Sequence, residues 1–96
     1  MFTNIKNVKF FAKGKRSNVY IGFYKGKRVA IKVERMVNGS IGNEAKWLKI
    51  LNKYNIGPKL FIFKDNYIVC EFIDGKSFLK CLKDSKKKYI KKIIKN

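Results

Sequence analysis

The sequence predicts an α+β fold, with a five-stranded antiparallel sheet, one packed helix and a C-terminal helical segment. Three observations support this prediction. Short β-rich runs separated by turn residues fill the first third of the chain. An amphipathic stretch with helical spacing follows, and a second pair of β-rich runs comes after it. Beyond that pair the pattern becomes helical and rich in lysine.

The first third of the chain is expected to form three strands, at residues 8–13, 19–24 and 28–33. A polar, glycine-bearing turn over residues 14–18 separates the first two strands. Lys25-Gly26-Lys27 favours a tight hairpin between the second and the third. Period-two alternation in the third strand predicts one face with Val29, Ile31 and Val33 and another with Arg28, Ala30 and Lys32.

A helix is expected to begin after Ser40 or Asn43, either of which could cap it, and to run to about residue 54. Residues 55–58, which contain Gly57 and Pro58, supply the stop. Helical spacing predicts that one face of this helix carries Glu44, Trp47, Leu48, Leu51 and Tyr54.

A second hairpin is expected from strands at residues 60–63 and 67–72, joined by a turn at 64–66. The charge changes after it. Residues 1–75 carry 15 basic and 5 acidic groups, whereas residues 76–96 carry 9 basic groups and 1 acidic group. We therefore expect one domain over residues 1–75 and a lysine-rich helical segment over 76–96, with the boundary near Gly75 and Lys76.

The side chains present exclude several kinds of chemistry. Histidine is absent, which excludes the usual nucleophile–histidine pairs and every histidine-containing zinc site. Cys70 and Cys81 give no disulfide framework and are too few for a structural zinc site. Any chemistry must use lysine, carboxylates or backbone groups.

The formal net charge is +18, from 24 basic and 6 acidic residues, so non-specific binding of polyanions such as RNA is expected. Lysines outnumber arginines by 21 to 3, which favours a diffuse field over a recognition surface. No apolar run approaches the ~18 residues of a membrane span, and the N-terminus lacks a signal-peptide pattern. We expect no membrane partner and a cytoplasmic location.

Four segments carry a family resemblance. Residues 12–20 form the glycine-bearing turn, residues 29–32 read VAIK, residues 44–51 open with Glu44, and residues 67–75 read YIVCEFIDG. In this order, and on these elements, they resemble the ATP-binding small lobe of protein kinases over about residues 8–80. Residues 12–20 and 56–60 are most similar to small atypical serine/threonine kinases, namely the RIO kinases and the kinase of the tRNA-threonylcarbamoylation complex.

The resemblance implies ATP as the ligand and Lys32 and Glu44 as the catalytic pair, with Lys32 neutralising the α- and β-phosphates. Adenine would bond to the Glu71 carbonyl and the Ile73 N–H, with Cys70 at the gatekeeper position. The implied nucleotide-binding set is Gly14, Ser17, Val19, Ala30, Lys32, Cys70, Glu71 and Ile73.

Physical arguments leave alternatives open at these positions. Small residues such as Gly14 and Ser17 let backbone N–H groups approach phosphate, but Ala12 replaces the first glycine, and a solvated turn fits as well. Lys32 lies in an apolar strand and could instead extend to solvent from an edge strand. A carboxylate at Glu44 is costly near an apolar seam unless it is paired, although the helix dipole alone also favours it.

Phosphoryl transfer needs carboxylates that hold Mg²⁺ and orient the acceptor, and no HRD-like or DFG-like segment follows the fifth strand. We expect Mg²⁺ only with a missing large lobe, to which a separate chain could contribute. By itself the chain should hold a nucleotide without transferring phosphate, so its status as an enzyme stays open.

Two other hypotheses remain. A basic nucleic-acid-binding module is supported by the charge, by the lysine run at residues 86–88 and by Tyr20 and Tyr24, although no nucleic-acid-binding fold signature fits the order of elements. An inactive remnant of a kinase is the third hypothesis.

Overall fold

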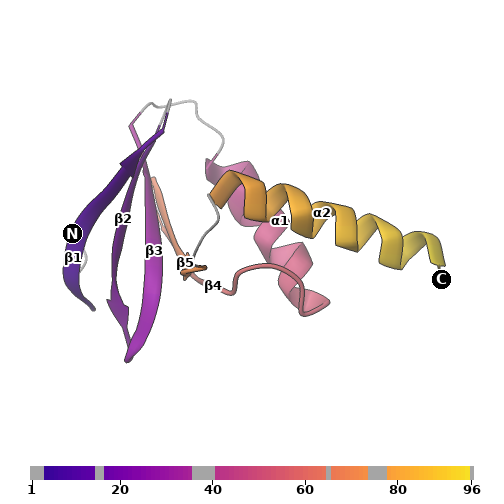
Figure 1. The fold of residues 1–96 in the computed structure, drawn as a ribbon, viewed down its shortest axis with the longest axis horizontal. Coiled ribbons are helices and arrows are strands. Elements are labelled where there is room, and N and C mark those ends of the chain that lie inside the picture. Colours follow the sequence, from indigo (N-terminus) through magenta and orange to yellow (C-terminus); the bar gives the residue numbers. More distant parts are fainter. Residues whose placement is uncertain (1–3, 15–16, 36–40, 65, 74–77, 96) are drawn as a thin grey trace.

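Five strands and two helices form in the order that the sequence pattern predicts (Figure 1). The computed structural model describes residues 4–14, 17–35, 41–64, 66–73 and 78–95. The strands make one antiparallel sheet of order β1-β2-β3-β5-β4, so the predicted α+β fold is confirmed. The elements are β1 (Ile5–Lys13), β2 (Ser17–Tyr24), β3 (Lys27–Glu34), α1 (Ile41–Lys53), β4 (Leu60–Lys64), β5 (Tyr67–Glu71) and α2 (Phe78–Lys95).

The β2–β3 hairpin sets the register of the sheet. Its two loop residues, Lys25 and Gly26, have φ values of 50° and 79°, and Tyr24 pairs with Lys27. Positive φ at both loop positions is the type I′ geometry, whose twist matches that of the flanking strands. From this turn the two strands pair without a bulge as far as Ser17 and Glu34.

Strand β1 is longer and less regular than predicted. It begins at Ile5 and pairs with β2 through two register shifts, which interrupt the alternation that a sequence pattern depends on. Gly22 of β2 lets β1 approach closely, because a Cβ atom there would lie 2.9 Å from Ile5 Cγ2. This irregular backbone explains why the alternation of apolar and polar residues predicted a strand over residues 8–13 alone.

The sheet is strongly curved. The rings of Tyr24 on β2 and Phe61 on β4 lie 5.6 Å apart, although β3 and β5 separate these strands, and three strand spacings in a flat sheet span about 14 Å. The curvature encloses a core made of strand residues alone, namely Ile5, Val29, Ile31, Tyr67 and Val69. A second core lies on the opposite face, where α1 packs on β5 through Ile41, Ala45, Leu48, Leu51 and Ile68.

A tertiary contact sets the start of α1. The helix begins at Ile41, whose N–H donates to Glu34 Oε1 at 3.3 Å, so a carboxylate from the end of β3 accepts a hydrogen bond from the first turn. Asn43 lies inside the helix and is exposed, so the prediction that it caps the helix is wrong. The alternative cap, Ser40, lies outside the described residues.

The C-terminus of α1 ends in a Schellman motif. Asn55 has φ 57°, and the N–H groups of Ile56 and Asn55 donate to the carbonyls of Leu51 and Asn52 at 3.0 and 3.1 Å. The left-handed residue that closes the Schellman motif is therefore Asn55, and not Gly57 as the sequence indicated. Gly57 (φ 78°) has a different role, because a Cβ atom there would lie 3.0 Å from Ser85 Oγ of α2.

Helix α2 contacts α1 through aromatic rings and then extends past it, away from the sheet (Figure 1). The ring of Tyr89 lies 6.2 Å from that of Trp47 and 5.3 Å from that of Tyr54. Three isoleucines beyond this contact are exposed, namely Ile90, Ile93 and Ile94. The predicted domain boundary near Gly75 and Lys76 lies outside the described residues.

The side chain of Asn52 organises the connection from α1 to β4. Its Nδ2 donates to the carbonyls of Ile56 and Pro58 at 3.2 and 3.0 Å, and its Oδ1 accepts the Leu60 N–H at 2.7 Å. One amide group thereby satisfies three backbone groups of a loop that the helix and the sheet both flank.

We expect Asn52→Ala to lower the free energy of unfolding by about 2–3 kcal/mol, because three hydrogen bonds are lost and half-buried backbone groups lose their partners. Chemical denaturation followed by circular dichroism measures this change. Asn43→Ala on the exposed side of the same helix is the matched control, with an expected change within about 0.5 kcal/mol. Equal losses in the two variants would contradict the role assigned to Asn52.

Candidate nucleotide site

The sheet register places four of the predicted site residues on one face. Val19 pairs with Lys32 across β2 and β3, and Ala30 pairs with Cys70 across β3 and β5. Directly paired residues, and residues two apart on one strand, share a face of a sheet. Lys32 also pairs with Ile68, which packs against α1, so all four lie on the face that α1 covers.

Lys32 reaches Glu44 of α1 across this face. Its Nζ lies 2.6 Å from Glu44 Oε1, so the predicted ion pair is present. The Lys32 side chain is 16% exposed and that of Glu44 is 7% exposed. Strand β3 lies in the centre of the sheet, which excludes the alternative that Lys32 extends to solvent from an edge strand.

Lys32 and Glu44 are 12 residues apart in the chain, and α1 begins at Ile41, three residues before Glu44. Glu44 lies in the first turn of the helix, where the helix dipole also favours a carboxylate. Its Oε1 accepts from Lys32, whereas its Oε2 is buried and has no hydrogen-bond partner among the described residues. A buried, half-satisfied carboxylate is costly, so its position depends on the ammonium group beside it.

The turn between β1 and β2 closes at the end of the same face. The Gly14 N–H donates to the Ser17 carbonyl at 2.8 Å, and Ser17 is buried. Ser17 pairs with Glu34, which is the next pair on the same face of the sheet, two residues along each strand from the pair of Val19 and Lys32. An arginine that the sequence reasoning did not single out, Arg35, donates from Nη2 to the Gly14 carbonyl at 2.6 Å.

The predicted hinge begins at the end of β5. Cys70 is 1% exposed and lies on the same face as Ala30. Glu71 pairs with Val29, so its side chain points to the other face, and its N–H donates to the Lys59 carbonyl at 2.8 Å.

Ile73 follows the end of β5 and is half-buried. Just before it, the Phe72 N–H donates to the Arg28 carbonyl at 3.2 Å, so pairing with β3 continues to that point. The turn at Asp74 and Gly75 lies outside the described residues. The structure thus groups Val19, Ala30, Lys32, Cys70 and Glu44, with the turn at one end of the face and Ile73 beyond the other.

The sequence pattern did not indicate two hydrogen bonds near the candidate site, those of Glu34 and Arg35. Both residues lie at the end of β3, and they bond to backbone atoms 7 and 21 residues away in the chain. Their rarity was the available signal, because the chain has six acidic residues and three arginines.

Comparison with known proteins adds no relative. No protein-family model and no curated protein matches the chain. Kinship with protein kinases therefore stays a prediction from the motifs. Among the described residues no group of three or more His, Cys, Asp or Glu side chains could hold a metal ion, and no helix there is long and apolar enough to cross a membrane.

The ion pair predicts a specific pattern of stability. Lys32→Met and Glu44→Met should each lower the free energy of unfolding by about 3 kcal/mol, because each removes one half of a largely buried ion pair. The double variant should recover most of that loss, since two apolar side chains then fill the space. Denaturant unfolding of the four proteins measures the coupling, and additive losses would show that the two charges do not depend on each other.

Proposed function

We propose that this chain binds ATP as the small lobe of a protein-kinase-like phosphotransferase, acting on serine or threonine. The observation that carries the proposal is the Lys32–Glu44 ion pair, which lies on the same sheet face as Val19, Ala30 and Cys70. An ammonium group held by a carboxylate is a fixed point charge that a phosphate oxygen can approach. A diffuse lysine field lacks this geometry.

The neighbouring residues suit the rest of the nucleotide. Ala30 and Cys70 pair directly, and both are small, so a flat ring can lie against this row of the sheet. Phosphates directed toward Lys32 would lie beneath the turn at Gly14 and Ser17, because that turn follows the Lys32 row. The adenine edge would then meet the backbone of Glu71 and Ile73.

Transfer of the phosphate requires groups beyond these. Among the described carboxylates, Glu44 pairs with Lys32, Glu34 accepts from the start of α1, Glu71 Oε1 accepts the Lys59 N–H at 3.4 Å, and Asp84 of α2 also has a partner. The proposal assigns the carboxylates that hold Mg²⁺ and orient an acceptor hydroxyl to a large lobe. A separate chain is one possible source. A cytoplasmic location, where ATP is available, is part of the proposal.

Nucleic-acid binding is the second candidate, and the edge strand β1 favours it. Phe10 and Phe11 of β1 are 59% and 54% exposed, and lysines 6, 9 and 13 lie on the same edge strand. Exposed aromatic rings beside cations suit single-stranded nucleic acid. Tyr20 and Tyr24, which the sequence indicated as rings for nucleic-acid binding, are half-buried and pack against the strand core.

Nuclear magnetic resonance titration of the full chain with ATP tests the proposal. At millimolar ATP we expect shifts concentrated at Val19, Ala30, Lys32 and Cys70. The Lys32→Met/Glu44→Met variant should lose about tenfold in affinity, as expected when a charged hydrogen bond to phosphate is removed. Lys27→Met, at the β2–β3 turn, is the control for net charge and should bind ATP as the parent chain does.

Titration with a uridine oligonucleotide separates the two candidates. Shifts restricted to β1, with affinity falling steeply as salt increases, would favour the nucleic-acid surface. Absence of any localised response to ATP would contradict the proposed function and favour the inactive remnant.

A further inference from the structure

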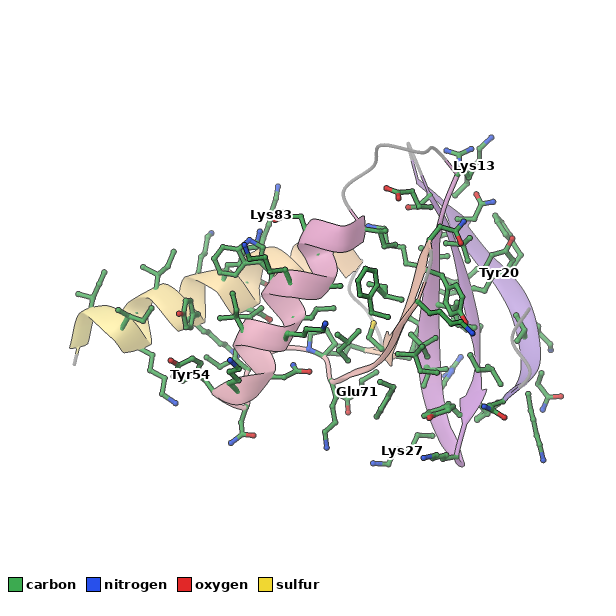
Figure 2. The ribbon with its side chains drawn as sticks, turned by 180° about the vertical axis from the view of Figure 1, so that it is seen from behind. Lys13, Tyr20, Lys27, Tyr54, Glu71 and Lys83 are labelled. Carbon is green, nitrogen blue, oxygen red and sulfur yellow. The ribbon has the colours of Figure 1, made fainter. Side chains whose placement is uncertain are left out.

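The end of helix α2 carries an exposed apolar surface. Ile90, Ile93 and Ile94 are 51%, 50% and 76% exposed, whereas Tyr89 just before them packs its ring against two aromatic rings of α1. Figure 2 shows Lys83 in the part of α2 that lies beside α1, and both figures show the helix continuing past α1, away from the sheet. Because the isoleucines come after the ring contact, they lie on this projecting end.

Helical spacing gathers the three isoleucines on one side of α2. Residues three and four apart are neighbours on a helix, so Ile90 lies beside both Ile93 and Ile94. With 3.6 residues per turn, Tyr89 and the isoleucines take one half of the circumference, and four exposed lysines take the other half. These lysines are Lys87, Lys88, Lys91 and Lys92. The projecting end of α2 is therefore an amphipathic helix with an apolar side and a basic side.

The charge of α2 determines which kind of partner can cover the apolar side. The helix contains eight lysines and one carboxylate, that of Asp84, in a chain whose formal net charge is +18. Two copies that met through this helix would bring their lysines together, and like charges at an interface oppose association. The complementary partner is anionic, and it must also accept apolar side chains.

The surface of an anionic phospholipid bilayer meets both requirements at once. A basic amphipathic helix lies in the membrane interface with its apolar side at the boundary of headgroups and acyl chains, while its lysines extend to the phosphates. Isoleucine has no ring to stack on a base, so single-stranded nucleic acid would leave the apolar side without a partner. Isoleucine also makes no directional contact, so a fluid apolar phase accommodates it without a matching groove.

The lysines on the isoleucine side of α2 suit the same partner. Lys83, Lys86 and Lys87 precede Ile90 by seven, four and three residues, so they continue its side of the helix toward α1. Lys86 is half-buried with its Nζ 4.6 Å from the centre of the Trp47 ring, whereas Lys83 and Lys87 are exposed. A flat anionic surface that receives the isoleucines therefore also meets these ammonium groups.

We propose that α2 binds the surface of an anionic phospholipid bilayer, with Ile90, Ile93 and Ile94 inserted and the surrounding lysines on the headgroups. Binding of this kind needs no membrane span, and the expectation of no membrane partner was drawn from apolar runs long enough to span. The inference does not involve the nucleotide site, so ATP binding and vesicle binding can each fail without the other.

Co-sedimentation of the full chain with lipid vesicles at near-physiological salt tests the inference. One set of vesicles is phosphatidylcholine alone, and the other contains about a third phosphatidylserine. We expect partition into the anionic vesicles to be at least about tenfold stronger, because each lysine near the surface gains from the negative potential. Equal partition into the two sets, or partition into neither, would overturn the inference.

The variant Ile90→Gln/Ile93→Gln/Ile94→Gln tests insertion of the apolar side. Glutamine keeps the net charge and a good helix propensity, so circular dichroism should show an unchanged helix content. Partition into the anionic vesicles should fall at least about tenfold, because three apolar side chains no longer leave water. If the triple variant does not fold, Ile94→Gln at the most exposed position should show a fall of about threefold. Partition equal to that of the parent chain would contradict the inference.

Two charge variants separate a built surface from the general field. Lys87→Gln/Lys91→Gln removes two charges from α2, and the control Lys25→Gln/Lys27→Gln removes two from the β2–β3 turn. The α2 variant should lose about tenfold or more in partition and the control less than about threefold. Equal losses would show an effect of net charge alone and overturn the inference.

Light scattering examines the alternative that a second copy covers the isoleucines. The parent chain should remain a monomer over the concentrations used with the vesicles. A dimer that the triple glutamine variant abolishes would show that a second copy covers this side of α2, and it would overturn the inference. Binding of a uridine oligonucleotide that the same variant abolishes, without vesicle binding, would assign the surface to nucleic acid instead.

Discussion

The ion pair between Lys32 and Glu44 joins the two parts of this fold. It connects the central strand β3 to the first turn of α1, across the face where α1 packs on the sheet. Both charges are largely removed from water, so neither position tolerates a shift that would leave the other unpaired. Helix α1 is therefore held by apolar packing through residues such as Leu48, and the ion pair fixes which turn of the helix lies against β3.

Strand β3 is the element on which the remaining contacts converge. Val29 and Ile31 fill the strand core on one face, while Ala30 and Lys32 belong to the candidate site on the other. At its C-terminal end, the Glu34 carboxylate accepts from α1, and the guanidinium of the following residue, Arg35, reaches the β1–β2 turn. A single central strand thus positions the helix, the turn and the row of Ala30 and Cys70, because strand pairing on both sides fixes its orientation.

The charge of the chain has two components with different consequences. Most of the positive charge comes from lysines on exposed surfaces, including the part of α2 that extends beyond α1. These lysines produce a general positive field, with no fixed arrangement of hydrogen-bond donors. A small part is fixed by specific partners, with Lys32 held by Glu44 and Arg35 held by Gly14. Binding that depends on the first component falls uniformly with salt, whereas the second can distinguish one anion from another.

Local sequence patterns were sufficient to predict the order and type of the helices and strands, the turn at Lys25 and Gly26, and the two faces of β3. A hairpin turn and the alternation of side chains along a strand both depend on residues that are neighbours in the chain. The motifs also predicted that Lys32 and Glu44 would meet. Tertiary structure alone decided the rest. The bond from Arg35 to Gly14 joins residues 21 apart in the chain, and the bonds of Glu34 and Asn52 close loops of irregular backbone over four to eight residues. Such contacts depend on sheet curvature and on helix packing, which no local periodicity encodes.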